Sequence, residues 1–123
     1  MKYSKKETKT EEKQEFDLQE LCVLWLNEGK NGYRYLSGYD LNKHRLVGFF
    51  NKKENEKQPT LRIYGVDEKG TLTDELITLW ESESKKEKIY LSGVTNENEK
   101  VIGFYGNEKE KKQPYVRCYL KDE

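Results

Sequence analysis

The chain has 123 residues, of which 37% are charged and 33% are hydrophobic, and its 23 Lys and Arg residues balance its 23 Asp and Glu residues. A protein that grips nucleic acid mainly through phosphates normally carries a basic excess or patch, so the balanced charge argues against that class while leaving local basic faces open. No apolar run approaches the roughly 20 residues of a membrane span, and the N-terminus has no apolar signal region, so we expect a cytoplasmic protein that does not bind a membrane.

The N-terminal segment, residues 1–15, consists almost entirely of Lys, Glu, Thr, Ser and Gln. A segment with so few apolar side chains cannot contribute to a core, so we expect a disordered charged tail. An arm that becomes ordered on a partner is the functional alternative. The folded part of the chain then begins near residue 16.

The rest of the chain repeats itself at a spacing of 55 residues, without a gap. The recurring segments are Tyr35–Gly38 and Tyr90–Gly93, Leu24-Trp25 and Leu79-Trp80, and Gly48-Phe49 and Gly103-Phe104. An internal period of this length indicates a tandem duplication, with one unit at residues 16–69 and the other at residues 70–123. Because a unit of about 50 residues buries little surface alone, we expect the two units to share one globular body.

Each unit contains short segments rich in strand-forming residues and separated by polar turns. In the first unit they lie at 21–26, 33–38, 46–50 and 60–66, and in the second at 76–80, 89–93, 101–105 and 115–120. This spacing predicts an antiparallel meander. Since no segment has a sustained helical period, the sequence predicts an all-β fold of two four-stranded units, packed as a sandwich or closed as a barrel.

Alternation along the last strand of each unit assigns its side chains to two faces. The expected core residues are Leu61, Ile63, Val116 and Cys118, and the side chains on the opposite face are Arg62, Tyr64, Tyr115, Arg117 and Tyr119. We take the second group as candidate binding residues, because Arg and Tyr are enriched in protein-binding hot spots and also serve single-strand-binding platforms. A purely structural role, in which each Arg and Tyr pair stiffens the sheet surface, stays open.

Other repeated residues have structural interpretations. Trp25 and Trp80 occupy equivalent positions, which predicts twin anchors in the core. A glycine inside a strand commonly marks a bulge, a bend or a close backbone approach. The repeated glycines that we interpret as structural are Gly38, Gly93, Gly48 and Gly103.

The two cysteines, Cys22 and Cys118, fall where the other unit has Ile77 and Ile63. We therefore interpret them as small buried hydrophobes, with a disulfide or a reactive thiol as the alternative. Together with the single histidine, His44, they are too few ligands for a metal site. We expect neither a metal nor a cofactor.

No residue set in the sequence predicts catalysis. The position equivalent to His44 is Glu99, so the one histidine is not part of the repeated pattern. Neither a Gly-x-Ser-x-Gly elbow nor a phosphate-binding loop is present. Ser37 and Ser92 are the best-placed hydroxyls, but a Ser before a Gly at the end of a strand ordinarily satisfies a backbone group at the turn. We therefore expect a protein that is not an enzyme.

Each unit resembles a class of small uncharacterised domains found on phages, plasmids and integrated elements of bacteria. That class reads Trp, then Tyr-x-Ser-Gly, then a Lys- and Asn-rich loop before Pro-Asp-Tyr-Arg-Val-Tyr. The matching segments here are Leu24-Trp25, Tyr35–Gly38 and Gln58–Tyr64, and again Leu79-Trp80, Tyr90–Gly93 and Gln113–Tyr119. The chain departs from the pattern at the Asp, where Thr60 and Tyr115 follow the prolines. The resemblance implies a mobile-element setting and a small β domain, and carries no catalytic residues.

These observations together predict a non-enzymatic binding protein of phage or mobile-element origin. Its expected partner is a host protein or ribonucleoprotein complex, and the concrete form is an anti-CRISPR-like inhibitor of a host defence nuclease that acts by protein–protein docking. The alternative is a single-stranded DNA- or RNA-binding protein that uses the aromatic and arginine faces of the sheet.

Overall fold

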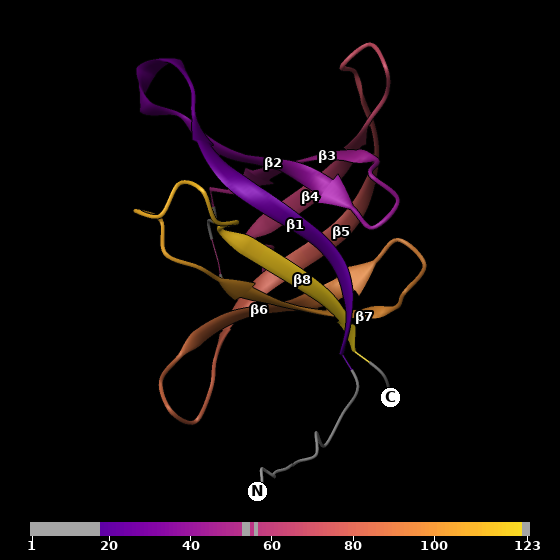
Figure 1. Cartoon of the computed structure of the whole chain (residues 1–123). Coiled ribbons are helices and arrows are strands. Elements are labelled where there is room, and N and C mark those ends of the chain that lie inside the picture. The colour runs from indigo at the N-terminus through magenta and orange to yellow at the C-terminus, as the bar shows by residue number, and fades with distance from the viewer. Residues whose placement is uncertain (1–17, 53–54, 56, 122–123) are drawn as a thin grey trace, which may run out of the picture.

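The computed structural model describes residues 18–52, 55 and 57–121, so the tail predicted for residues 1–15 lies outside the described part. The described strands are β1 (Leu18–Glu28), β2 (Arg34–Asp40), β3 (Arg45–Phe50), β4 (Leu61–Val66), β5 (Leu72–Glu83), β6 (Ile89–Thr95), β7 (Lys100–Tyr105) and β8 (Val116–Lys121). A short 3-10 turn, η1 (Lys30–Gly32), joins β1 to β2. Each strand pairs with the next, and β8 pairs with β1, so the sheet closes into a barrel (Figure 1).

This architecture confirms the all-β prediction and decides between its two forms in favour of the barrel. β1 and β5 are longer than predicted because the neighbouring strands pair with their polar ends. Leu18 lies opposite Lys121, and Glu28 lies opposite Arg34, so strand pairing continues beyond the apolar stretch at residues 21–26. Local apolar content could not indicate this extension.

Strand register repeats at the same spacing as the sequence. Leu24 lies opposite Gly38 between β1 and β2, and Leu79 lies opposite Gly93 between β5 and β6. The two seams between the halves, β4–β5 and β8–β1, also have matching registers. The barrel therefore relates β1–β4 to β5–β8 by an approximate twofold symmetry. The tandem duplication that would explain this symmetry stays a prediction.

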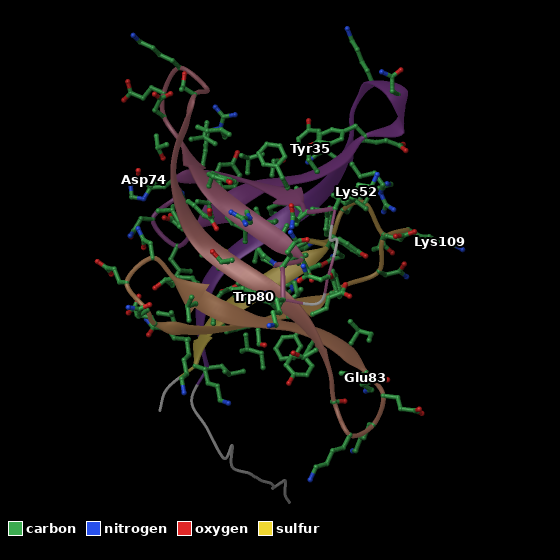
Figure 2. The ribbon with its side chains drawn as sticks, turned by 180° about the vertical axis from the view of Figure 1, so that it is seen from behind. Tyr35, Lys52, Asp74, Trp80, Glu83 and Lys109 are labelled. Atoms are coloured by element: carbon green, nitrogen blue, oxygen red, sulfur yellow. The ribbon has the colours of Figure 1, made fainter. Side chains whose placement is uncertain are left out.

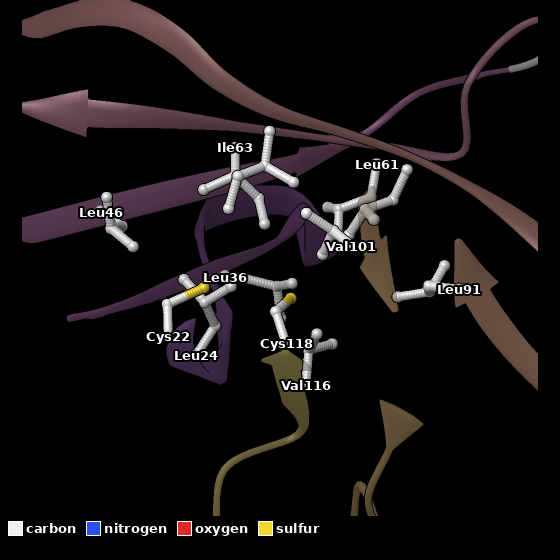
Figure 3. Close-up of a cluster of buried hydrophobic side chains, with 12 residues drawn as sticks. Cys22, Leu24, Leu36, Leu46, Leu61, Ile63, Leu91, Val101, Val116 and Cys118 are labelled. Carbon is white, nitrogen blue, oxygen red and sulfur yellow. The ribbon is translucent and has the colours of Figure 1, made fainter. Parts of the chain in front are cut away.

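The described hydrophobic core consists of counterpart pairs, one member from each half. The pairs are Cys22 and Ile77, Leu24 and Leu79, Leu36 and Leu91, Leu46 and Val101, Leu61 and Val116, and Ile63 and Cys118 (Figure 3). The inward placement predicted for the last two pairs is confirmed. Fully burying one such aliphatic side chain contributes roughly 1.5–3 kcal/mol, so the core needs both halves to accumulate enough stability.

The repeated glycines serve two different purposes. A Cβ built on Gly38 would lie 1.9 Å from the carbonyl oxygen of Val23, so only glycine lets β2 approach β1 this closely. Gly93 has the same relation to Thr78, at 1.8 Å. A Cβ on Gly48, by contrast, would first meet the Leu61 side chain at 3.3 Å. Gly48 thus leaves room for core side chains.

The register shifts of the barrel do not lie at Gly48 or Gly103. In the described strands they occur between Glu20 and Cys22 on β1, and between Ile63 and Tyr64 and between Tyr64 and Val66 on β4. These shifts fall in the seams between the halves, where a bulge increases the local twist that barrel closure requires. The bulge considered for Gly48 and its counterpart Gly103 is therefore not found there.

The interpretation of Trp25 and Trp80 as core anchors is wrong. Their neighbours Leu24 and Leu79 point into the barrel, and because side chains alternate along a strand, both indoles point outward and are half-buried. Both lie on the outer surface of the barrel, where Trp80 is labelled in Figure 2.

Candidate functional site

A groove on the outside of the first half crosses β1, β2 and β3 and has a volume of about 620 Å³. We call it groove A. Its walls carry four aromatic side chains and one cation, namely Trp25, Tyr35, Tyr39, Phe49 and Arg45. Alternation along the strands positions these side chains, since the residues between them, such as Leu24 and Leu36, point into the core.

A second groove lies on the outside of the other half, across β5, β6 and β7, with a volume of about 580 Å³. We call it groove B. Its described lining residues are Trp80, Tyr90, Ser92, Gly93, Val94, Lys100, Val101, Ile102 and Lys121. Each of them stands 55 positions after a residue that lines groove A. The twofold symmetry of the fold therefore extends to its surface.

The two grooves share a Trp, a Tyr, a Ser and a cation but differ at the other positions. Tyr39 of groove A corresponds to Val94 of groove B, and Arg45 corresponds to Lys100. Groove B has a second cation, Lys121. Among the described residues that line either groove, none is Asp or Glu. Both grooves therefore suit a ligand that offers flat apolar surface and negative charge.

The serines of the repeated motif lie inside these grooves rather than at a strand end. Ser37 is in the middle of β2, and its hydroxyl accepts a hydrogen bond from the side-chain amide of Asn27 at 2.7 Å. The counterpart Ser92 is 3.3 Å from the hydroxyl of Ser82. The expectation that these hydroxyls satisfy backbone groups at a turn is corrected, because strand pairing continues past both of them.

The predicted binding residues Arg62 and Tyr64 border groove A. They lie on β4, opposite Phe49 and Val47 of β3, and the rings of Tyr64 and Phe49 are 6.0 Å apart. The guanidinium of Arg62 also donates a hydrogen bond to Glu75 at 3.3 Å, which compensates part of its charge. The outward placement of this pair follows the predicted alternation.

Tyr119 borders groove B because it lies opposite Ile102, which lines that groove, whereas Arg117 lies opposite Phe104, which does not. The ring of Tyr119 lies 5.9 Å from that of Phe104, as Tyr64 lies against Phe49 in the other half. Arg117 donates to the side-chain oxygen of Gln113 at 3.4 Å instead of to a carboxylate. The two Arg and Tyr pairs are thus equivalent in position but differ in the charge that surrounds them.

Groove A continues into a row of aromatic rings across β2, β3 and β4. The Tyr33 ring stacks on Tyr35 at 6.2 Å and lies 6.5 Å from Phe49, which in turn contacts Tyr64. Tyr33 is 53% exposed, and Tyr35 is labelled in Figure 2. An exposed row of rings on a rigid sheet is a surface that favours stacking or apolar docking.

Tyr115, the fifth predicted binding residue, lies away from both grooves. Its ring is 5.3 Å from that of Tyr105, in a pocket of about 530 Å³ that Arg34 and Glu81 also line. The Tyr105 hydroxyl donates to Glu81 at 2.7 Å. Burial, together with this hydrogen bond, raises the pKa of Tyr105, and burial raises the pKa of Tyr115. Both phenols therefore stay protonated at neutral pH and cannot serve as bases.

Sequence reasoning missed most of the groove residues. Tyr35, Arg45 and Lys100 received no role, and the two tryptophans were assigned to the core. A signal was nevertheless present, because Leu24 and Trp25 are adjacent in one strand and cannot both point inward. The position of Arg45 beside Trp25 carried no such signal, since it depends on how β1, β2 and β3 pair.

The remaining chemistry of the described residues is limited. They contain no group of three or more His, Cys, Asp or Glu side chains arranged to hold a metal ion. Within the same residues, no helix has the length and apolar character to cross a membrane. The imidazole of His44 lies 3.0 Å from the carboxylate of Asp40 in the exposed turn between β2 and β3.

The fold and the grooves define an eight-stranded antiparallel β-barrel with two equivalent aromatic and cationic grooves on its outer surface in the described part of the chain. Compared with known proteins, the chain matches no family model, no curated protein and no solved structure. Its function must therefore be argued from the grooves themselves.

Proposed function

We propose that this protein is a non-enzymatic binding protein of a phage or another mobile element, which docks on a host protein or ribonucleoprotein complex in the bacterial cytoplasm. The observation that supports this proposal most is that Trp25, Tyr35 and Arg45 together line groove A on the outside of the barrel. Trp, Tyr and Arg are the residues that dominate binding energy at protein interfaces. Their clustering on the outside of the barrel is not needed for a core.

Inhibition of a host defence nuclease, as by an anti-CRISPR protein, is the concrete form that we propose. Strand pairing in the described part leaves no unpaired sheet edge, so the barrel presents its grooves on a preformed scaffold. A preformed surface loses little conformational entropy on docking, which favours tight binding by a small inhibitor. Two grooves on one body also allow both to engage a partner at once.

The test is a cleavage assay with purified host defence nucleases, to which the protein is added at increasing ratios. Inhibition that saturates near one protein per nuclease, and that is lost in Tyr35→Ala with Arg45→Ala, supports the proposal. Lys86→Ala is a matched control, because Lys86 lies in the turn between β5 and β6 and lines neither groove. If no nuclease is inhibited and none co-elutes with the protein, the inhibitor form is excluded.

Single-strand binding is the second candidate, and one observation favours it. Each groove combines a Trp and a Tyr with a cation, and the described linings contain no carboxylate. Aromatic rings that stack on bases beside a cation that contacts phosphate are the usual elements of single-strand recognition. The net charge of zero argues against a large contribution of phosphate contacts to nucleic-acid affinity.

Fluorescence anisotropy of labelled single-stranded DNA, single-stranded RNA and duplex DNA separates the two candidates. Saturable binding to single strands, weakened by salt and by Tyr64→Ala or Tyr119→Ala, would make single-strand binding the preferred function. Absence of binding even at low salt would leave a protein partner, and the nuclease assay then decides.

A further inference from the structure

The seam that closes the barrel brings together the two cysteines of the chain. Cys22 of β1 lies directly opposite Cys118 of β8, and both thiols are free. Their exposures are 1% and 0%. Figure 1 shows β1 beside β8, and Figure 3 shows both sulfur atoms in the buried cluster.

The other seam of the barrel supplies an internal comparison. At the equivalent place between β4 and β5, Ile63 lies opposite Ile77, with a register shift next to the pair as in β1–β8. One seam therefore has two alkyl side chains where the other has two thiols. Because the isoleucine pair meets the packing need at the same register, packing alone does not require cysteines at the second seam.

The register is compatible with the Cα spacing of a disulfide bond. Directly opposite residues of an antiparallel pair have Cα atoms about 4.5 or about 5.5 Å apart. A disulfide bridges Cα atoms that are about 4.4–6.8 Å apart, so either kind of pair is suitable. Both side chains point to the same side of the sheet, into the barrel, so the sulfurs can meet without rotation of a strand.

We propose that Cys22 and Cys118 form a reversible disulfide that locks the β1–β8 seam, by exchange with a low-molecular-weight disulfide such as oxidised glutathione. The thiolate of one cysteine attacks the small disulfide and releases one molecule of thiol. The second cysteine then attacks the mixed disulfide and releases the other. Two protein thiols are oxidised, one small disulfide is reduced to two thiols, and these carry away both protons.

Burial makes this exchange depend on opening of the seam. The neighbouring Cys118 side chain and burial both raise the pKa of the Cys22 thiol, so little of the reactive thiolate forms in the closed barrel. Oxidation therefore takes place during folding or when β1 and β8 separate. In a reducing cytoplasm the pair remains as two thiols, and oxidising conditions favour the disulfide.

The test is to unfold the full chain and refold it in glutathione buffers that range from reducing to oxidising, followed by alkylation and intact-mass analysis. We expect a cross-linked monomer in oxidising buffer, lighter by two hydrogen atoms before alkylation and returned to the dithiol by dithiothreitol. The bond closes a long loop, so the thermal midpoint should rise by on the order of 10 °C. Two free thiols at every ratio, disulfide-linked dimers instead of monomers, or a lower midpoint on oxidation would each overturn the proposal.

A double variant, Cys22→Ile with Cys118→Ile, reproduces the other seam and serves as the matched control. It should fold with a midpoint that is insensitive to the redox buffer. Adding Ile63→Cys and Ile77→Cys to it moves the thiols to β4–β5 and should restore the redox response. If this last variant folds but does not cross-link, the seam register does not determine the bond and the argument fails.

Discussion

The indole nitrogen of Trp25 donates a hydrogen bond to the carbonyl oxygen of Lys112, 3.4 Å away, across the boundary between the two halves. In the symmetric arrangement, Trp80 donates to the carbonyl oxygen of Lys57 at 3.0 Å. Each tryptophan therefore holds the long loop of the opposite half against the barrel. Two backbone hydrogen bonds join the halves at the same places. The N–H of Tyr115 donates to the carbonyl oxygen of Leu24, and the N–H of Thr60 donates to that of Leu79, both at 2.8 Å.

Replacing Trp80 by Phe should remove this hydrogen bond while it keeps much of the apolar contact. We expect the free energy of unfolding to fall by about 1 kcal/mol, the usual net contribution of one hydrogen bond. Amide exchange around Lys57 should accelerate at the same time. Trp25→Phe should have a smaller effect, because its bond is longer. Urea unfolding and hydrogen exchange measure both quantities, and equal effects would contradict the geometric ranking.

Gly38→Ala should be far more harmful than Gly48→Ala. The new methyl group at Gly38 would overlap the carbonyl oxygen of Val23, which is backbone and can move only if β1 and β2 separate. At Gly48 the methyl meets the Leu61 side chain at 3.3 Å, so repacking should limit the loss to about 1–3 kcal/mol. Urea midpoints of both variants test this order, and a Gly48→Ala variant that is the less stable one would refute it.

Asp40 should make folding stability depend on pH in the acid range. Burial alone would raise the pKa of its carboxyl, but hydrogen bonds from the backbone N–H groups of His44 and Asn42, each 2.9 Å long, and from the His44 ring lower it below the usual 3.8. Because the pKa is lower in the folded state, this stabilisation is complete above the unfolded pKa and is lost as the pH falls through the folded pKa.

The test of this acid dependence is urea unfolding from about pH 6 to about pH 2. Asp40→Asn should lose stability less steeply than the unaltered protein below about pH 4, the unfolded pKa. His44→Ala removes the ring donor but keeps the backbone N–H donors to Asp40. The acid-dependent loss of stability that Asp40 causes should therefore persist in part. Parallel pH profiles of Asp40→Asn and the unaltered protein would show that Asp40 contributes nothing.

For binding, Arg45→Ala should weaken the complex more than Arg62→Ala. The Arg62 guanidinium already donates to Glu75, whereas Arg45 lines groove A with no carboxylate among the described lining residues. A hot-spot arginine contributes on the order of 2 kcal/mol, so the dissociation constant should rise roughly 30-fold in Arg45→Ala. Titration of whichever partner the two assays identify measures the change, and Lys86→Ala is the control. An Arg62→Ala effect as large as that of Arg45→Ala would contradict the ranking.

The two grooves should also act together if both engage the same partner. Arg45→Ala and Lys100→Ala should then each weaken binding moderately, and the double variant should lose more than either, because the tethered second site no longer benefits from a high effective concentration. A silent Lys100→Ala variant would mean that groove A binds alone. The same titrations provide this comparison.

The strands of this protein and the inward direction of Leu61, Ile63, Val116 and Cys118 could be predicted from the sequence. Alternation between apolar and polar residues is a local property, so it indicates a strand and its buried face before any partner strand is known. The spacing of 55 residues likewise predicted that the strands of one half would have counterparts in the other. Local patterns were misleading where the residue type was weighed above the alternation, as for Trp25, and where a strand was expected to end early, as at Ser37.

Only the tertiary structure decided how the strands close on one another. The position of Cys22 opposite Cys118 and of Trp25 against the loop at Lys112 depends on the β1–β8 closure. Trp25 and Arg45 line one groove because β1, β2 and β3 pair, and Trp80 meets the loop at Lys57 because β4 pairs with β5. These residues are far apart along the chain or belong to different strands, so no local period relates them. Their contacts arise because separate strands of the chain pair with each other, and the last of these pairings, β8 with β1, completes the barrel.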